Sequence, residues 1–206
     1  MKKTLVFILC MLLLMGCTSP KVTNQNNEKQ ISTLDKISYT DKTNLTQKVV
    51  GDIKDDYPVY EYELSHLLKS ASIRIWEKEN QWENKITSYE DDIYSKGQIA
   101  IVLKDEAYNI HLIHSDTENS LVNYNVSQHY SKSLNNHKIM SANVLDNKKI
   151  EAGEEIVLFT VLGYKDDKPT QSQEYSDFKD IDCDYGVVIT IAFYDTEQAP
   201  RVNEGQ

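Results

Sequence analysis

The chain has 206 residues, of which 26% are charged, and its formal net charge is −10 at pH 7. Its 32 Asp and Glu against 22 Lys and Arg give a surface that repels polyanions, because binding to a phosphate backbone requires clustered basic side chains. We therefore expect no nucleic acid as a partner, whereas cationic partners remain compatible with the composition.

The first seventeen residues carry the most specific motif of the chain. Lys2 and Lys3 precede an apolar run over residues 5–15, and the run closes with Leu14-Met15-Gly16-Cys17. This run is shorter than the ~20 residues that a helix needs to cross a bilayer, and its length fits the hydrophobic region of a secretory signal.

This pattern resembles the lipobox of bacterial lipoproteins, in which Leu, a variable residue and a small residue precede Cys. The resemblance implies that residues 1–16 are a signal peptide that is removed, and that the Cys17 thiol carries a diacylglyceryl group. It also implies that the new amino group is acylated, for example with palmitate, and that lipid holds the protein on the extracytoplasmic face of the cell membrane. Loss of Lys2 and Lys3 would lower the formal net charge to −12.

The remaining cysteines predict a domain without internal disulfides. Cys10 leaves with the signal and Cys17 takes lipid, so Cys183 stays alone and the domain must be held by its core. Polar residues dominate the range 17–55, which predicts a lipidated Cys followed by a disordered, flexible linker. A short helix over residues 31–38 is an open alternative.

From residue 56 onward, short apolar segments alternate with polar turns. Period-two alternation predicts strands over 59–64, 72–77, 98–104 and 108–114, with weaker signals over 121–126 and 138–144. Nearly continuous apolar runs over 155–164 and 185–194 predict central strands. We therefore expect residues 56–195 to form an all-β domain, an antiparallel β-sandwich of about eight or nine strands, with a single closed sheet as the alternative. A tail follows over 196–206.

An acidic segment lies just before the last apolar run. Asp180, Asp182 and Asp184 alternate, so their carboxylates would project from one face of an extended segment and offer the oxygen ligands that Ca²⁺ prefers. An EF-hand is excluded, because Tyr185 stands where that loop needs Gly and Ile191 where it needs the bidentate Glu. The alternatives are an irregular Ca²⁺ loop and a solvated segment before a buried strand.

Two tryptophans mark a predicted hairpin. Trp76 and Trp82 flank residues 77–81, which places an indole at each mouth of the turn. Exposed indoles stack on sugar rings or anchor protein interfaces, so Trp76 and Trp82 are the candidate ligand-binding residues. The alternative is a cross-strand pair at the edge of the core.

The chain carries no recognisable catalytic motif. It contains no Gly-x-Ser-x-Gly elbow, no Gly-rich phosphate loop and no His-Glu-x-x-His. We therefore expect a binding or interaction module at the cell envelope, for a glycan, a protein or a small solute, rather than an enzyme. A structural or regulatory accessory subunit of an envelope complex is the first alternative, and an envelope hydrolase is the second.

Overall fold

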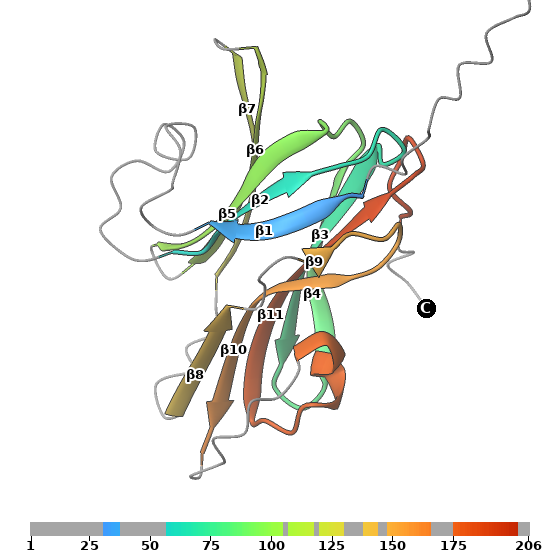
Figure 1. Ribbon diagram of the computed structural model, residues 1–206. Helices are drawn as coiled ribbons and strands as arrows, with labels where there is room; N and C mark the ends of the chain where they lie inside the picture. The colour runs from blue at the N-terminus through green and yellow to red at the C-terminus, as the bar shows by residue number, and fades with distance from the viewer. Residues whose placement is uncertain are drawn as a thin grey trace, which may run out of the picture.

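The fold is taken from a computed structural model, which describes residues 31–37, 57–104, 107–117, 120–129, 138–143, 148–165 and 175–201. These residues form two antiparallel sheets that pack face to face (Figure 1). The predicted β-sandwich is confirmed. The alternative of a single closed sheet is wrong, because the chain forms two separate open sheets.

The two sheets, named sheet A and sheet B, divide the strands unequally. Sheet A has the order β7-β6-β5-β2-β1-β9, built from β1 (Thr33–Ile37), β2 (Val59–Glu63), β5 (Lys96–Lys104), β6 (Ala107–Thr117), β7 (Ser120–His129) and β9 (Lys148–Lys149). Sheet B has the order β4-β3-β11-β10-β8, built from β3 (Ser70–Lys78), β4 (Trp82–Glu90), β8 (Lys138–Asn143), β10 (Ile156–Tyr164) and β11 (Tyr185–Tyr194). A short 3-10 helix, η4 (Tyr175–Asp180), precedes β11.

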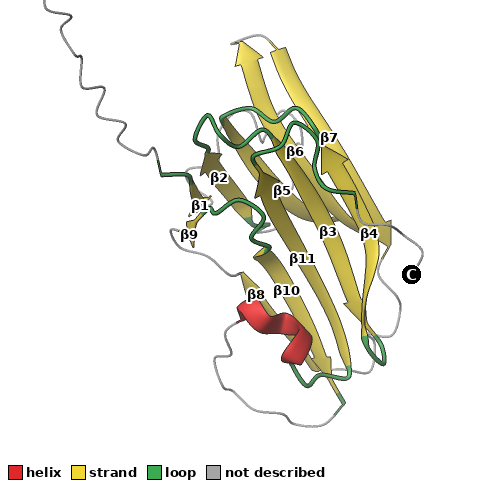
Figure 2. Cartoon of the chain, turned by 90° about the vertical axis from the view of Figure 1, so that its right-hand side faces the viewer, coloured by secondary structure: helices red, strands yellow, loops and turns green. Residues whose placement is uncertain are grey.

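The predicted central strands lie inside sheet B. β11 occupies the middle of the sheet with β10 beside it, and every residue of β11 except Tyr194 is buried. Both faces of these strands are covered, by sheet A on the inside and by η4 on the outside (Figure 2). A strand buried on both faces needs apolar side chains at consecutive positions, which explains why these segments do not alternate.

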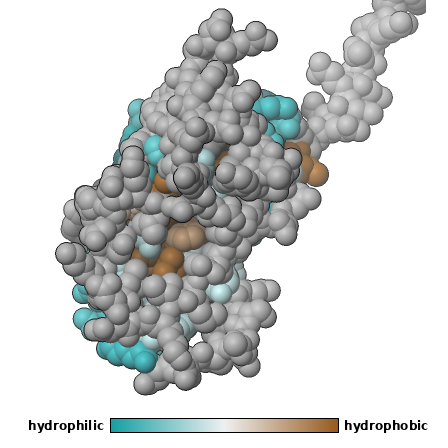
Figure 3. All heavy atoms as spheres, turned by 90° about the vertical axis from the view of Figure 1, so that its left-hand side faces the viewer, coloured by the Kyte–Doolittle hydropathy of each residue, from teal (hydrophilic) through white to brown (hydrophobic). Residues whose placement is uncertain are grey.

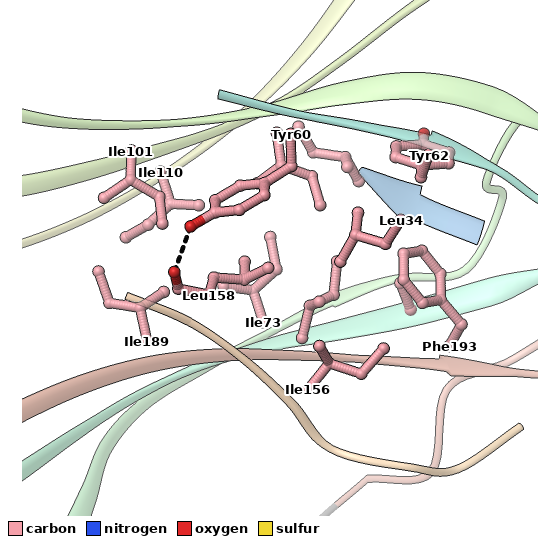
Figure 4. Close-up of a cluster of buried hydrophobic side chains, with 14 of the residues drawn as sticks. Leu34, Tyr60, Tyr62, Ile73, Ile101, Ile110, Ile156, Leu158, Ile189 and Phe193 are labelled. Atoms are coloured by element: carbon pink, nitrogen blue, oxygen red, sulfur yellow. Dashed lines mark hydrogen bonds between the residues drawn. The ribbon is translucent and has the colours of Figure 1, made fainter. Parts of the chain in front are cut away.

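The core between the sheets is built from Ile, Leu and aromatic side chains of both layers (Figure 4). The Tyr60 hydroxyl of β2 donates a hydrogen bond across this core to the carbonyl of Leu158 in β10. Leu158 lies at a β-bulge, where Val157 pairs with Thr190 and Phe159 with Ile189, so that Leu158 has no opposite residue on β11. Tyr60 therefore supplies a hydrogen-bond donor to the Leu158 carbonyl at a point where the ladder with β11 is interrupted. Burial raises the pKa of this hydroxyl, which keeps its proton in place.

Residues 33–37 differ from the sequence prediction. They lie in the range expected to be a linker, or in part a short helix, and instead they form β1, which pairs with β2. Leu34 is fully buried in the core, and the Ser32 Oγ accepts a hydrogen bond from the Ser65 amide at 2.8 Å. The Ser32 carbonyl accepts another from the Ile150 amide at 2.9 Å. The other parts of the predicted linker, residues 17–30 and 38–55, lie outside the described ranges.

Replacing Tyr60 by Phe tests the bond between the sheets. The change leaves the buried Leu158 carbonyl without its donor, so we expect the free energy of unfolding to fall by about 1–3 kcal/mol, measured by urea denaturation. Tyr62→Phe is the matched control, because the Tyr62 hydroxyl is also buried and has no hydrogen-bond partner among the described residues. Its loss is expected to change stability little. Equal losses in the two variants would contradict the assignment.

Candidate functional site

An aromatic cluster joins η4 to the outer face of sheet B. Phe178 of η4 is buried between the two tryptophans, with ring centroids 5.7 Å from Trp76 and 5.1 Å from Trp82. The contact with Trp82 is edge-to-face, an arrangement that aromatic quadrupoles favour. Trp76 and Trp82, the predicted ligand-binding residues, are therefore brought together, and Phe178 is the partner that the sequence did not reveal.

The hairpin places both indoles on the same face. β3 and β4 pair antiparallel with Lys78 opposite Trp82, and Gly186 of β11 lies opposite Lys78 on the other side of β3. A Cβ atom at Gly186 would collide with the Trp82 ring. The absence of a side chain at Gly186 thus lets the indole extend across β3 and lie on β11.

Cys183 belongs to the same packing layer. Cys183 is buried and forms no disulfide in the described part of the chain, and it packs in a cluster with Val157, Leu162, Tyr164, Phe178, Ile181 and Val188. This position makes Cys183 a packing residue between η4 and sheet B.

A carboxylate beside the cluster is held by three side chains. Glu155 Oε1 accepts hydrogen bonds from Trp76 Nε1 at 2.9 Å and from Thr190 Oγ1 at 2.5 Å. Its other oxygen lies 3.5 Å from Nη1 of Arg74. Since two strands, β3 and β11, and the residue before β10 contribute to this network, it fixes the orientation of Trp76 relative to the rest of sheet B.

A cavity of about 370 Å³ opens beside this network. Its lining consists of Glu155 together with Ser176, Asp177, Phe178, Lys179 and Asp180. The Lys179 ammonium lies 4.0 Å from the centroid of the Trp76 ring, a cation–π distance. Both indoles are half-buried and pack against a core cluster, so they form no open platform and lie at the edge of the core, although they are not directly opposite each other, since Trp76 pairs with Asn84 and Trp82 with Lys78.

The acidic segment does not build a metal site in the described residues. Asp180, Asp182 and Asp184 are exposed and alternate with buried Ile181 and Cys183, but Asp180 is the last residue of η4, so the three do not share one extended segment. Moreover, no three His, Cys, Asp or Glu side chains in the described ranges form a group that could hold a metal ion. Asp184 instead accepts a hydrogen bond from the Lys165 amide at 2.9 Å. Ca²⁺ binding by this segment stays a prediction without geometric support.

Glu77 is a buried carboxylate that no sequence motif marks. It lies on β3 near the same end of sheet B, and burial raises the pKa of its carboxyl group. The nearby Lys85 ammonium and a hydrogen bond with Tyr185 act in the opposite direction, whereas Glu79 adds to the increase. Glu77 alternates with the half-buried Trp76 and Lys78, and its side chain lies on the same face of β3 as the core residues Ile73 and Ile75. Its burial therefore follows from the packing of the two sheets and has no signal in the sequence.

Comparison with known proteins gives no relative for this chain. No protein-family model, curated protein or solved structure matches it. Within the described ranges, no helix combines the length and hydropathy needed to cross a membrane. Function is therefore inferred from the residues themselves.

Replacing Phe178 by Ala tests whether this residue holds η4 on the sheet. Removal of the ring opens a cavity between Trp76 and Trp82, so we expect a red shift of tryptophan fluorescence and a stability loss of about 3 kcal/mol. Ser176→Ala is the control, because Ser176 is exposed on the same short helix. Unchanged emission in the Phe178 variant would contradict the packing described here.

Proposed function

We propose that this protein is a lipid-anchored, extracytoplasmic binding module that presents the end of the sandwich around η4 to a protein of the cell envelope. The anchor rests on the lipobox-like residues 14–17, with Cys17 as the lipidated residue. Diacylglycerol supplies two acyl chains, and two chains hold a protein on a membrane far more firmly than one.

The observation that carries the binding role is the arrangement of a charged rim over a fixed aromatic base. We name this the η4 surface: the exposed residues Ser176, Asp177, Lys179 and Asp180, which line the cavity together with Glu155 and Phe178, while Trp76 and Trp82 pack against Phe178 and complete the aromatic base. Protein interfaces commonly combine aromatic anchors with a polar rim. The base is held in place by Glu155, so the surface is preorganised for a partner.

The covered ring faces favour a protein over a glycan. Sugar stacking needs an open aromatic face, whereas Phe178 packs against both indoles and Lys179 lies over Trp76. A small solute is the second candidate, because the cavity falls within the size range of small-ligand sites.

Two further features support binding rather than catalysis by this surface. Glu155 is the carboxylate that bonds to the aromatic base through Trp76, and it already accepts a second hydrogen bond from Thr190 and pairs with Arg74. The rim carboxylates Asp177 and Asp180 favour a partner with a basic contact patch, since opposite charges steer association.

Photo-cross-linking in the native bacterium tests the partner. A photoreactive phenylalanine analogue at Asp177, in the full chain, is expected to give one discrete protein adduct in the membrane fraction. The same analogue at Glu61, which is exposed on β2, is the control and is expected to give no such adduct. Absence of an adduct at residue 177, or the same adducts at both positions, would contradict the proposal.

The same cells test the anchor separately. Mass spectrometry of the mature N-terminal peptide is expected to find diacylglyceryl on Cys17, and Cys17→Ser is expected to leave the membrane fraction. An unmodified Cys17 at the mature N-terminus would contradict the proposed lipid anchor, whether or not the photo-cross-linking at residue 177 gives a protein adduct.

A further inference from the structure

The large hydrophobic side chains that are exposed in the described part of the chain are Ile31 and Leu67, and both lie at one end of the sandwich. Ile31 is 61% exposed and Leu67 is 54% exposed. Both line one groove of about 910 Å³. Figure 3 shows hydrophobic surface at the corner of the fold where the described chain begins. We name this part of the molecule the Leu67 end.

The Leu67 end is a fixed structure. Leu67 lies in a turn closed by a hydrogen bond from the Leu68 amide to the Ser65 carbonyl, at 3.1 Å. The Lys69 amide donates to the Tyr194 carbonyl at 2.8 Å, and the Lys69 carbonyl accepts from the Ile93 amide at 3.0 Å. The exposed Leu67 side chain is therefore presented from a braced loop, and its exposure is a property of the fold.

The chain enters the fold at this end, close to the predicted anchor. Ser32 is held by Ser65 and Ile150, directly after Ile31. Between Cys17 and Ser32 the chain reaches at most about 50 Å when fully extended. If Cys17 is lipidated, Ile31 and Leu67 are thus kept near the bilayer, which gives even a weak contact a high effective concentration.

We propose that the Leu67 end docks on the lipid surface of the membrane, with Leu67 and Ile31 inserted at the boundary between headgroups and acyl chains. This inference rests on the proposed lipid anchor. Apolar side chains at a membrane interface gain by leaving water, and Leu67 and Ile31 project together at the point where the tether brings them within reach.

The charges around the groove define the kind of lipid surface. Its lysines are both paired, Lys69 Nζ with Glu197 at 3.1 Å and Lys149 Nζ with Glu151 at 2.8 Å. Asp195 lines the same groove. Because neighbouring carboxylates neutralise the positive charge of these lysines, attraction to anionic headgroups does not hold the Leu67 end on the membrane. Docking is therefore expected on zwitterionic lipid, without a need for anionic lipid.

Docking by the Leu67 end would orient the η4 surface away from the membrane. Ser70 and Tyr194 pair at one end of sheet B and Lys78 and Gly186 at the other, so the two surfaces lie at opposite ends of β3 (Figure 2). β3 itself spans about 26 Å from Ser70 to Lys78.

Photo-cross-linking to lipid tests this orientation. The chain from Cys17 onward, with Cys183→Ala, is coupled through the Cys17 thiol to a maleimide lipid in phosphatidylcholine vesicles that carry a diazirine-bearing phosphatidylcholine. Cross-links are expected in the peptides that contain residue 31 and residues 64–69, and not in the peptide that contains residues 175–184. The chemical attachment makes the result independent of whether cells lipidate Cys17, so failure of docking and failure of the anchor are distinguishable.

A variant pair makes the test specific to the side chain. Leu67→Gln is expected to lower cross-linking at residues 64–69 about tenfold, the factor that corresponds to the lost burial of one Leu side chain. Gln81→Ala, at an exposed position at the other end of β3, is expected to leave the yield unchanged. Three outcomes would overturn the proposal: uniform cross-linking along the chain, cross-linking centred on residues 175–184, or an unchanged yield in Leu67→Gln. Each of them would instead indicate that the groove binds a protein partner.

Discussion

Leu34 is fully buried between the two sheets, and Ser32 just before it accepts hydrogen bonds from the amides of Ser65 and Ile150. Together with the pairing of β1 with β2, these contacts determine where the chain enters the sandwich. The entry point in turn determines which end of the fold stands nearest the predicted lipid. If β1 were absent from sheet A, neither the η4 surface nor the Leu67 end would have a defined position relative to the membrane.

The two ends of sheet B have different surface chemistry. The Leu67 end exposes aliphatic side chains, whereas the η4 surface exposes charged side chains beside the buried Phe178 and the half-buried Trp76 and Trp82. A protein that is anchored near one end and offers a polar, preorganised surface at the other is suited to meet partners in the envelope. This division of roles links our proposals, although each depends on different residues and has its own test.

Much of the fold follows from local patterns in the sequence. The alternation at residues 72–77 and 98–104 predicts strands buried on one face, and the continuous apolar runs at 155–164 and 185–194 predict strands buried on both. β1 has no such signal, because Leu34 is its one apolar side chain described as buried and its remaining stability comes from neighbours distant in sequence. The bulge at Leu158 is equally hidden, since it depends on the partner strand and on Tyr60 from the other sheet.

The candidate site was predicted less completely than the fold. Trp76 and Trp82 stand out by residue type and by their spacing around a turn, and the structure brings them together. Their covering by Phe178 depends on where η4 packs, and the contact of Glu155 with Arg74 and Trp76 joins residues about eighty positions apart. Such contacts between distant segments are set by the tertiary fold and have no local signature in the chain.

Hydrogen exchange of the backbone amides of residues 33–37 tests the central claim most directly, since β1 is what fixes the tether to one end of the sandwich. If β1 is an integral strand of sheet A, its ladder amides exchange as slowly as those of β2 and are released together with them. Exchange of these amides at the rate of an unstructured peptide, while β2 remains protected, would contradict the account.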